Sequence, residues 1–466
     1  MVFWLTGSKN DGSVLNEYLA VIAACTAFFT LGVHQGWTSP SIPKLQSPEY
    51  PFEISNEEAS YITMFASLGD IFGEILCSIF VDRIGRKKTM LYSGFPILFS
   101  FIFIYFSYYT PVVLYIARLL GGICFGVIMS ISPIYTSEIS RPRIRGKLGV
   151  LGACSFIFGL VAVNLVGTYL NIQETALIFA IIAMVFLFTF SLMPETPYYL
   201  LMINKVQEAE KSLVFFRRST NVKSELQSLT DDVERQMSER GEFKDLILNE
   251  TNRKALILMI FARIFQQMTG ATVFAMYTQH LLSSMDEVFQ PHIAILSIYT
   301  LQAFVVLLSG NLSDKFGRVP LMVCSAASCF ITLMLQGGYF TIRDFTNLGL
   351  PLWTPALLLA VYYFLFQIGL GSLLNIMLGE MFSASIKPKA ICVVNMTLSL
   401  TIMFTAKLYQ VCSDYLHISV CFYIFAASSF ISVFFFKFFF LETKGKTLEE
   451  IQMELKGVKK RQSVVA

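Results

Sequence analysis

Twelve separate stretches of this chain are long and apolar enough to cross a lipid bilayer, and this feature limits its possible folds more than any other. A membrane-spanning helix needs about 20 mostly apolar residues. Six stretches precede residue 194 and six follow residue 253, and their approximate limits are 17–37, 58–81, 89–109, 111–136, 146–169, 173–193, 254–284, 290–313, 320–342, 352–383, 389–412 and 416–440. We therefore expect an all-α membrane protein with twelve transmembrane helices.

The composition supports a membrane protein and excludes several other classes. Of the 466 residues, 55% are apolar and 14% are charged, and the mean hydropathy is +0.62. A soluble domain has about 25% charged residues, so a soluble enzyme is excluded. The net charge of +3 is too small to indicate a basic surface for nucleic acid, so a nucleic-acid-binding protein is excluded. The nine cysteines fall in apolar stretches without a CxxC pair, which is typical of small core residues and excludes a disulfide scaffold.

The distribution of polar residues divides the chain into four predicted parts. The one long polar segment lies between the two sets of apolar stretches and has apolar residues at helical spacing, which predicts short amphipathic helices. A disordered linker is the alternative. The expected parts are an N-terminal six-helix bundle at 1–193, a cytoplasmic helical linker at 194–253, a C-terminal six-helix bundle at 254–440 and a cytoplasmic tail at 441–466.

The positions of the basic residues predict the orientation of the chain. Most of the 35 Lys and Arg residues fall in segments that share one side of the membrane with both termini. Only Lys44 and Arg343 fall in the loops on the other side. Because positive charge collects on the cytoplasmic side, we expect both termini to be cytoplasmic.

The two halves share a charged turn at the same place. Asp82-Arg83-Ile84-Gly85-Arg86 follows the second apolar stretch, and Asp314-Lys315-Phe316-Gly317-Arg318 follows the eighth. This repetition predicts a duplicated six-helix unit. Paired repeats around a site at the membrane midplane are common in secondary transporters.

Further motifs resemble those of a known family. They occur in order as Arg118-x-x-x-Gly122-x-x-x-Gly126, Pro133-x-Tyr135-x-x-Glu138 running to Arg145-Gly146, Pro194-Glu195-Thr196-Pro197, Gln266-Gln267-x-x-Gly270 and Glu442-Thr443-Lys444-Gly445. Together with the two charged turns, they resemble the sugar porter family of the major facilitator superfamily from about Leu31 to Ile451. The stretch Gly32-x-x-x-Gly36-Trp37-Thr38-Ser39-Pro40 is most similar to insect trehalose carriers and their relatives.

A carrier that opens alternately to the two sides needs contacts that lock its cytoplasmic side and then release it. Charge-assisted hydrogen bonds suit this task. We expect the acidic and basic residues of the charged turns and adjoining motifs to form such a gate, because the orientation rule alone does not call for acids. The candidates are Asp82, Arg83, Arg86, Glu138, Arg145 and Glu195 in the first half, and Asp314, Arg318 and Glu380 in the second.

The candidate sugar site is carried mainly by amides in apolar helices. Gln266 and Gln267 are costly in lipid unless they face a cavity, and the resemblance implies that they bind the sugar. The resemblance also places Asn395 at a sugar contact, Gln302 and Thr272 where the family has Asn, and Asn375 in the tenth span. For Asn395 and Gln302 the alternative is a role in helix packing. Two aromatic rings complete the set, Tyr277 and Phe366.

This chain departs from the family pattern mainly in the cavity. The Pro-x-Pro-Trp of the tenth span is replaced by Ser372-Leu373-Leu374-Asn375, so two helix-breaking prolines and an aromatic ring are missing. His34 stands where proton-coupled relatives carry Asp, and Asp70 and Glu74 share one face of the second span. A proton site is one interpretation of these three residues. The interpretation we prefer is a neutral His34, with acids that lie near the ends of the span or line a wet cavity.

The predicted function is facilitative transport, or uniport, of a sugar such as trehalose or a hexose across the plasma membrane. The alternatives are a proton-coupled sugar symporter and a sugar sensor that does not transport. The sequence has no ATP-binding G-x-x-x-x-G-K-S/T motif and no catalytic or metal-ligand spacing, so we expect neither an enzyme nor a cofactor. The expected partners are the sugar and the bilayer, without nucleic acid, and the oligomeric state is left open.

Overall fold

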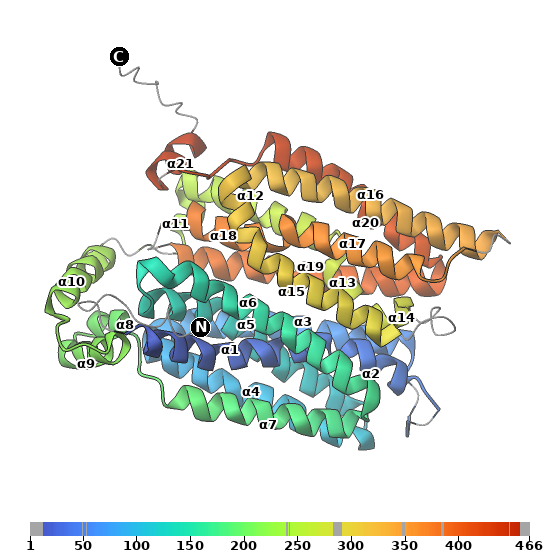
Figure 1. The fold of residues 1–466 in the computed structure, drawn as a ribbon, viewed down its shortest axis with the longest axis horizontal. Helices are drawn as coiled ribbons and strands as arrows, with labels where there is room; N and C mark the ends of the chain where they lie inside the picture. The colour runs from blue at the N-terminus through green and yellow to red at the C-terminus, as the bar shows by residue number, and fades with distance from the viewer. Residues whose placement is uncertain are drawn as a thin grey trace, which may run out of the picture. The chain divides into compact units, whose positions relative to one another are not determined.

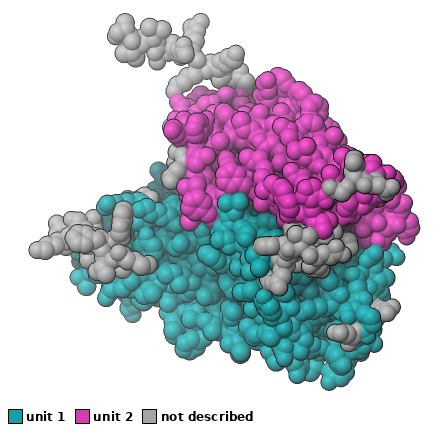
Figure 2. All heavy atoms as spheres, turned by 45° about the vertical axis from the view of Figure 1, so that its right-hand side comes forward, with its two compact units in different colours: residues 1–239, 275–303 teal, residues 240–274, 304–466 magenta. Residues whose placement is uncertain are grey.

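In the computed structural model the described residues are 13–48, 50–52, 54–238, 241, 243–282, 291–346, 350–383, 386–446 and 448–456, and they contain helices but no strand (Figure 1). The chain divides into two compact units, which are coloured separately in Figure 2. Unit 1 comprises Met1–Glu239 and Ala275–Ala303, and unit 2 comprises Arg240–Phe274 and Phe304–Ala466. The predicted division into four parts remains a prediction.

Unit 1 contains the helices of the first half and of the segment that follows it. They are α1 (Leu15–Gly36), α2 (Thr38–Leu45), α3 (Asn56–Ile84), α4 (Arg86–Phe106), the 3-10 helix η2 (Ser107–Tyr109), α5 (Val112–Ile139), α6 (Pro142–Tyr169), α7 (Ile172–Ser191), α8 (Pro197–Met202), α9 (Val206–Arg217), α10 (Lys223–Ser238) and α14 (Thr278–Leu282).

Two helices cross the division between the units, namely α13 (Ala271–Met276) and α15 (Pro291–Phe316). Unit 2 contains the remaining helices. They are α11 (Asp245–Leu248), α12 (Glu250–Gln267), α16 (Arg318–Phe345), α17 (Thr354–Ile368), α18 (Leu370–Met381), α19 (Lys387–Tyr415), α20 (Ile418–Phe438) and α21 (Leu448–Leu455).

Ten of the described helical segments are long and apolar enough to span a membrane, which makes this a multi-pass membrane protein. They coincide with all six stretches predicted in the first half and with the last four of the second half. The stretch predicted at 254–284 is not one continuous helix, because α12 ends at Gln267 and Gly270 has a φ of +84°. The stretch at 290–313 corresponds to α15. The number of twelve spans remains a prediction.

Side-chain caps explain where several of these helices begin. Ser55 precedes α3 and accepts a hydrogen bond from the backbone N–H of Glu58, whose carboxylate accepts the backbone N–H of Ser55. Asn171 and Glu174 make the same reciprocal pair at the start of α7. Each pair satisfies two backbone donors that have no partner within a helix, so it fixes the first turn.

Small residues allow α3 and α5 to pack with their backbones in direct contact. A Cβ atom on Gly122 would lie 2.0 Å from the carbonyl oxygen of Ala66, and one on Gly126 would lie 2.1 Å from that of Asp70. Any side chain at these two positions would push the helices apart. Gly122 and Gly126, at i and i+4, therefore serve close helix packing, as small residues at this spacing do in membrane proteins.

The polar segment between the two sets of spans contains α8, α9 and α10. Their apolar faces form a small core of Leu200, Leu201, Ala209 and Val233. Most apolar residues at the predicted helical spacing are buried or partly buried, but Val206 and Met237 are exposed. Helices of this kind are what the spacing predicts.

A buried acid holds α9 against the ends of the spanning helices in unit 1. Glu17 of α1 is 0% exposed, and its carboxylate lies 2.9 Å from Arg217 of α9 and 3.1 Å from Arg141, which precedes α6. Arg217 also contacts the carboxylate of Glu225 in α10 at 2.7 Å. A buried carboxylate is tolerated when charged donors surround it, so α9 is fixed to α1.

Candidate functional site

The first charged turn is capped by a glutamate from the far end of the first half. Gly85 has a φ of +97°, and α4 begins at the next residue. The carboxylate of Glu195 accepts the backbone N–H of Lys87 at 2.9 Å. Because the first N–H groups of a helix have no helical partners and carry partial positive charge, this carboxylate stabilises the start of α4.

The side chain of Arg86 lies at the centre of the same turn and is buried. Its guanidinium contacts Glu138 of α5 at 3.1 Å and Asp82 of α3 at 3.2 Å. The hydroxyl of Thr196 donates to the other oxygen of Glu138 at 2.5 Å. The turn, α5 and the segment after α7 are thereby joined in one network, which we call the first turn network (Asp82, Arg86, Glu138, Glu195 and Thr196).

Unit 2 contains a second network with the same plan. Gly317 has a φ of +95°, α16 begins at Arg318, and the carboxylate of Glu442 accepts the backbone N–H groups of Arg318 and Val319, each at 3.0 Å. The guanidinium of Arg318 contacts Glu380 at 3.1 Å, and the hydroxyl of Thr443 donates to Glu380 at 2.6 Å. We call Arg318, Glu380, Glu442 and Thr443 the second turn network.

The two capping glutamates differ in their electrostatic setting. Burial raises the pKa of Glu195 above its ordinary 4.5, although the N–H groups of Lys87 and Thr196 act in the opposite direction. Burial also acts to raise the pKa of Glu442, but the backbone N–H groups of Arg318, Lys444 and Val319 outweigh it and lower the pKa below 4.5. The backbone N–H groups therefore offset the cost of burying the carboxylate more fully at Glu442 than at Glu195.

The structure brings most of the predicted gating residues into these networks, but not all of them. Arg83 is exposed, and its carbonyl oxygen accepts a hydrogen bond from the hydroxyl of Tyr199 at 3.0 Å. The side chain of Asp314 lies outside the described residues. Sequence reasoning missed Thr196, Glu442 and Thr443 as members, although the repeated Glu-Thr pair at 195–196 and 442–443 could have indicated them.

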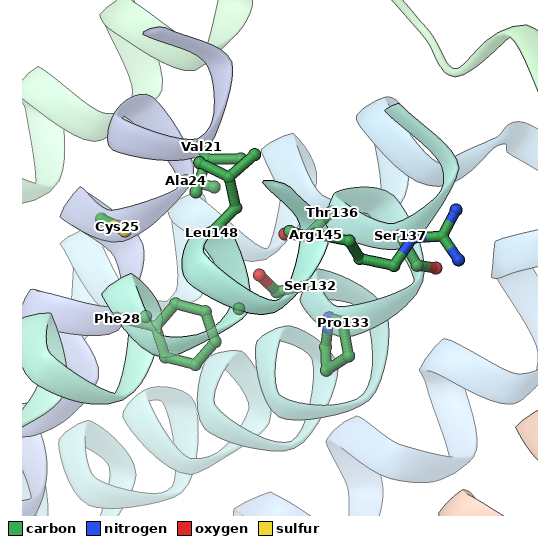
Figure 3. Close-up of a pocket in the computed structure, with 12 residues that line it drawn as sticks. Val21, Ala24, Cys25, Phe28, Ser132, Pro133, Thr136, Ser137, Arg145 and Leu148 are labelled. Carbon is green, nitrogen blue, oxygen red and sulfur yellow. The ribbon is translucent and has the colours of Figure 1, made fainter. Parts of the chain in front are cut away.

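Arg145 lies apart from the first turn network, beside a cavity of about 140 Å³ (Figure 3). The cavity is bounded by α1, α5 and α6, and Arg145 lies near Ser137 while Phe28 lies on the opposite side. The guanidinium donates a long hydrogen bond of 3.5 Å to the carbonyl oxygen of Ser140. Arg145 is therefore an exposed charge at the rim of a mostly apolar hollow.

Five of the predicted sugar-site residues lie in the helices of unit 2. Gln266 and Gln267 end α12, Thr272 lies in α13, Asn375 in α18 and Asn395 in α19. The hydroxyl of Thr272 donates to Oε1 of Gln267 at 2.7 Å, and Nε2 of Gln266 donates to the carbonyl oxygen of Leu370 at 2.6 Å. Leu370 begins α18 directly after the break at Gly369, so Gln266 satisfies a carbonyl beside that break.

A buried arginine that sequence reasoning did not select joins two of these amides. Arg263 of α12 is 3% exposed and donates to Oε1 of Gln266 at 2.9 Å and to Oδ1 of Asn375 at 2.5 Å. The signal available in the sequence was a cation in the middle of an apolar stretch, which marks a functional position in membrane proteins.

The other three predicted sugar-site residues are placed differently. Phe366 is buried in α17, with its ring stacked on Tyr362 at 5.9 Å, so packing accounts for it. Tyr277 and Gln302 belong to unit 1. Tyr277 is buried between α13 and α14, and Gln302 is half-buried in α15.

The ionisable residues within the spans of unit 1 form a buried set of their own. Arg118 is 0% exposed, donates to the carbonyl oxygen of His34 at 2.5 Å and lies over the ring of Trp37 at 5.5 Å. Asp70 interacts electrostatically with Arg118, and the hydroxyl of Ser130 donates to Glu74. Both acids are buried and engaged rather than placed at the ends of their helix, which corrects that part of the preferred interpretation.

The described part of the chain has two units with matching turn networks and ten helices long and apolar enough to span a membrane, and its fold is that of the major facilitator proteins. The chain is similar in fold to the xylose transporter XylE from E. coli in a partially occluded inward-open conformation, with a TM-score of 0.79 at 20% identity over 93% of this chain and all of that one. A sugar-analogue-bound structure of the same symporter gives a TM-score of 0.75 at 22% identity, covering 95% of this chain and 99% of that one.

The family model described as "Sugar (and other) transporter" matches residues 11–455, so the chain belongs to this family of transporters. Its relatives include the facilitated trehalose transporter Tret1 of Drosophila mojavensis, 27% identical over 98% of this chain and 54% of that protein. Tret1 of Bombyx mori is 27% identical over 96% of this chain and 88% of that protein. The chain spans about half the length of the Drosophila relatives it matches.

Proposed function

We propose that this protein is a facilitative sugar carrier of the plasma membrane, with twelve spans, both termini in the cytoplasm and alternating access to the two sides. The observation that carries the proposal is the pair of turn networks, one in each unit, at equivalent places in a duplicated plan. Charge-assisted hydrogen bonds are strong in a dry contact and exchange readily with water when exposed. A carrier that opens and closes at its cytoplasmic side needs contacts with both properties.

The substrate assignment rests on the amides of unit 2 and on the relatives. Amides donate and accept hydrogen bonds, as sugar hydroxyls do, and Gln266, Gln267 and Asn395 are all buried in helices of unit 2. The relatives are named as facilitated trehalose transporters, so trehalose and hexoses are the first candidates.

A proton-coupled symporter is the second candidate, and a specific observation favours it. Asp70, Glu74, His34 and Arg118 are all buried within the spans of unit 1. Buried ionisable groups in a membrane commonly serve ion or proton movement. Uniport remains our first proposal, because Arg118 and Ser130 already engage the two acids and thereby give them a structural role.

The deciding experiment is uptake of labelled trehalose and glucose by oocytes that express the full chain, at about pH 5.5 and about pH 7.5, on either side of the ordinary histidine pKa. We expect saturable uptake that is the same at both values. Uptake stimulated by acid would establish the symporter. No uptake of any sugar, with the chain shown at the cell surface, would contradict transport and favour a sensor.

A substitution tests whether the amides of α12 bind the sugar. Changing Gln267→Leu removes a donor and an acceptor from a buried site, so we expect the half-saturation concentration to rise about tenfold or more. The matched control is Gln336→Leu, which changes a buried glutamine of α16 whose amide donates to the carbonyl oxygen of Pro355. Equal half-saturation in wild type and Gln267→Leu would move the site elsewhere.

A further inference from the structure

The hollow beside Arg145 in unit 1 owes its space to two glycines of α6 (Figure 3). Gly149 and Gly152 both line it, three residues apart on one face of the helix. A Cβ atom on Gly149 would meet nothing within 4 Å, whereas one on Gly152 would lie 2.8 Å from the ring of Phe28. The absent side chain at 149 therefore leaves open space, and the absent side chain at 152 admits the phenylalanine ring.

The size and the walls of the hollow suit one six-membered ring. Its volume is about 140 Å³, and an apolar cavity of about 150 Å³ in another protein binds benzene. Val21, Pro133 and Leu148 contribute apolar walls, and Phe28 offers a ring on the side opposite Arg145 (Figure 3). A sugar does not match these walls, because its hydroxyls would lose hydrogen bonds to water without gaining others.

The polar edge of the hollow presents donors and one positive charge. The hydroxyls of Ser132 and Thr136, one turn apart on α5, donate to no other residue in the described part of the chain. Arg145 lies near the start of α6, where the helix dipole adds positive potential, and its guanidinium makes one long hydrogen bond, to the carbonyl oxygen of Ser140. None of the described lining residues is acidic, so the charge of Arg145 has no counter-ion within the hollow.

We propose that this hollow binds a small aromatic carboxylate, with its single ring against Phe28 and its carboxylate at Arg145. The ring replaces water along the apolar walls, which is favourable in proportion to the area covered. The carboxylate only accepts hydrogen bonds, so it pairs with the guanidinium and with the two free hydroxyls. None of the described lining residues belongs to the predicted sugar site, so the inference does not depend on which sugar is transported.

The test measures binding of single-ring acids to the purified full chain in detergent, by protection against thermal unfolding. The probes are benzoate, phenylacetate and 3-phenylpropionate, which differ in the length between ring and carboxylate, and each is compared with its uncharged amide. We expect at least one acid to bind about threefold or more tightly than its amide, since Arg145 is exposed and an exposed ion pair has an effect of about this size. High salt should reduce this preference. Equal binding of acid and amide throughout the series would overturn the proposal.

Cys25 reports whether the ring occupies the hollow itself. Its side chain lines the hollow and is half-buried, so a bound ring should slow its reaction with a thiol reagent, followed by mass spectrometry of the labelled peptide. Cys324 of α16 is exposed and belongs to unit 2, so its labelling should not change. Binding of the acid without slower labelling of Cys25 would place the ligand elsewhere and contradict the proposal.

A pair of variants on α6 tests the space. Gly149→Leu fills the hollow and should weaken binding of the acid about tenfold or more. The matched control is Gly146→Leu, where a Cβ atom also meets nothing within 4 Å but which is not a lining residue, and it should bind as wild type does. Undiminished binding in Gly149→Leu would overturn the assignment, and the labelling of Cys25 in the wild-type chain decides the question if that variant does not fold.

A second pair of variants tests the charge. Arg145→Gln should make the acid and its amide bind about equally, whereas Arg145→Lys, which keeps the charge, should retain part of the preference. The matched control is Arg143→Gln, which removes an exposed arginine of the same helix that is not a lining residue, and the preference should remain. An undiminished preference for the acid in Arg145→Gln would remove this residue from the site.

Discussion

At the scale of the residue, the most constrained positions are the glycines of the two charged turns. Gly85 and Gly317 have φ near +95°, where a side chain is strained, and each lies against the carboxylate that caps the following helix. A Cβ atom at Gly85 would lie 2.3 Å from Oε2 of Glu195, and one at Gly317 would lie 2.8 Å from Oε2 of Glu442. Glycine is needed at both positions for conformation and for space.

The first prediction is that Gly85→Ala destabilises the protein by about 1–3 kcal/mol, because it adds backbone strain and displaces Glu195 from the start of α4. The measurement is thermal unfolding in detergent. The control is Gly338→Ala, a helical glycine of α16 whose added Cβ meets nothing within 4 Å, where alanine should be neutral or stabilising. Equal unfolding temperatures for Gly85→Ala and wild type would show that the turn tolerates a side chain.

Sequence reasoning could predict which residues belong to the turns but not all of their partners. Arg86 and Glu138 could be selected because they belong to the repeated charged turn and to the adjoining Pro133-x-Tyr135-x-x-Glu138 motif, and the structure pairs them. The contact of Arg263 with Asn375 could not be found, because it depends on how α12 and α18 are rotated about their axes. A pattern of apolar residues limits such a rotation but does not fix it to the precision of a hydrogen bond.

At the scale of the element, the capping glutamates are the clearest sign of duplication. Glu195 lies beyond α7 and caps α4, whereas Glu442 lies beyond α20 and caps α16. The pKa of the first is raised and that of the second is lowered. The two capping carboxylates, Glu195 and Glu442, therefore contribute to the stability of the fold with opposite dependence on pH.

The second prediction compares Glu195→Gln and Glu442→Gln with wild type during thermal unfolding from neutral pH to about pH 4. A carboxyl whose folded pKa is raised binds protons preferentially in the folded state, so wild type should gain stability relative to Glu195→Gln as the pH falls toward 4.5. A carboxyl whose folded pKa is lowered stabilises the fold above its ordinary pKa. Wild type should therefore lose its advantage over Glu442→Gln only as the pH falls below 4.5. The same slope in both comparisons would contradict the assignment.

The elements themselves were largely predictable, with one instructive failure. Long apolar stretches predict spans directly because the bilayer sets their length. The stretch at 254–284 was different: a run of apolar residues does not reveal that the backbone turns at Gly270. The structure also divides this region between the two units at residues 274 and 275, a matter of packing that composition does not record.

At the scale of the whole molecule, the proposed function requires that the two units change their arrangement while each keeps its own structure. Each turn network is closed within one unit, so its ion pairs also serve the stability of that unit. Arg145, like Arg83, lies outside these networks. It is exposed beside a hollow of unit 1, and its guanidinium makes one long hydrogen bond to a described residue, so it contributes little to the stability of that unit.

The third prediction is that Arg145→Ala lowers sugar uptake several-fold and leaves the amount of protein at the cell surface unchanged. Loss of this charge should favour the outward-open arrangement under the proposed orientation. Labelling of Cys25, which lines the same hollow, by a thiol reagent from the cytoplasmic side should then decrease, with Cys25→Ser as the blank. Normal uptake and normal labelling would remove Arg145 from the gate.

The buried anchor at Glu17 has a consequence for the order of events during synthesis. Glu17 leaves the ribosome early, yet one partner, Arg141, follows 124 residues later and the other, Arg217, only after all six spans of the first half have been made. Until then the acid has only one of its two guanidinium partners, Arg141. The first bundle can insert before that moment but cannot complete its inner surface, so a chain that stops before α9 should remain a substrate for quality control.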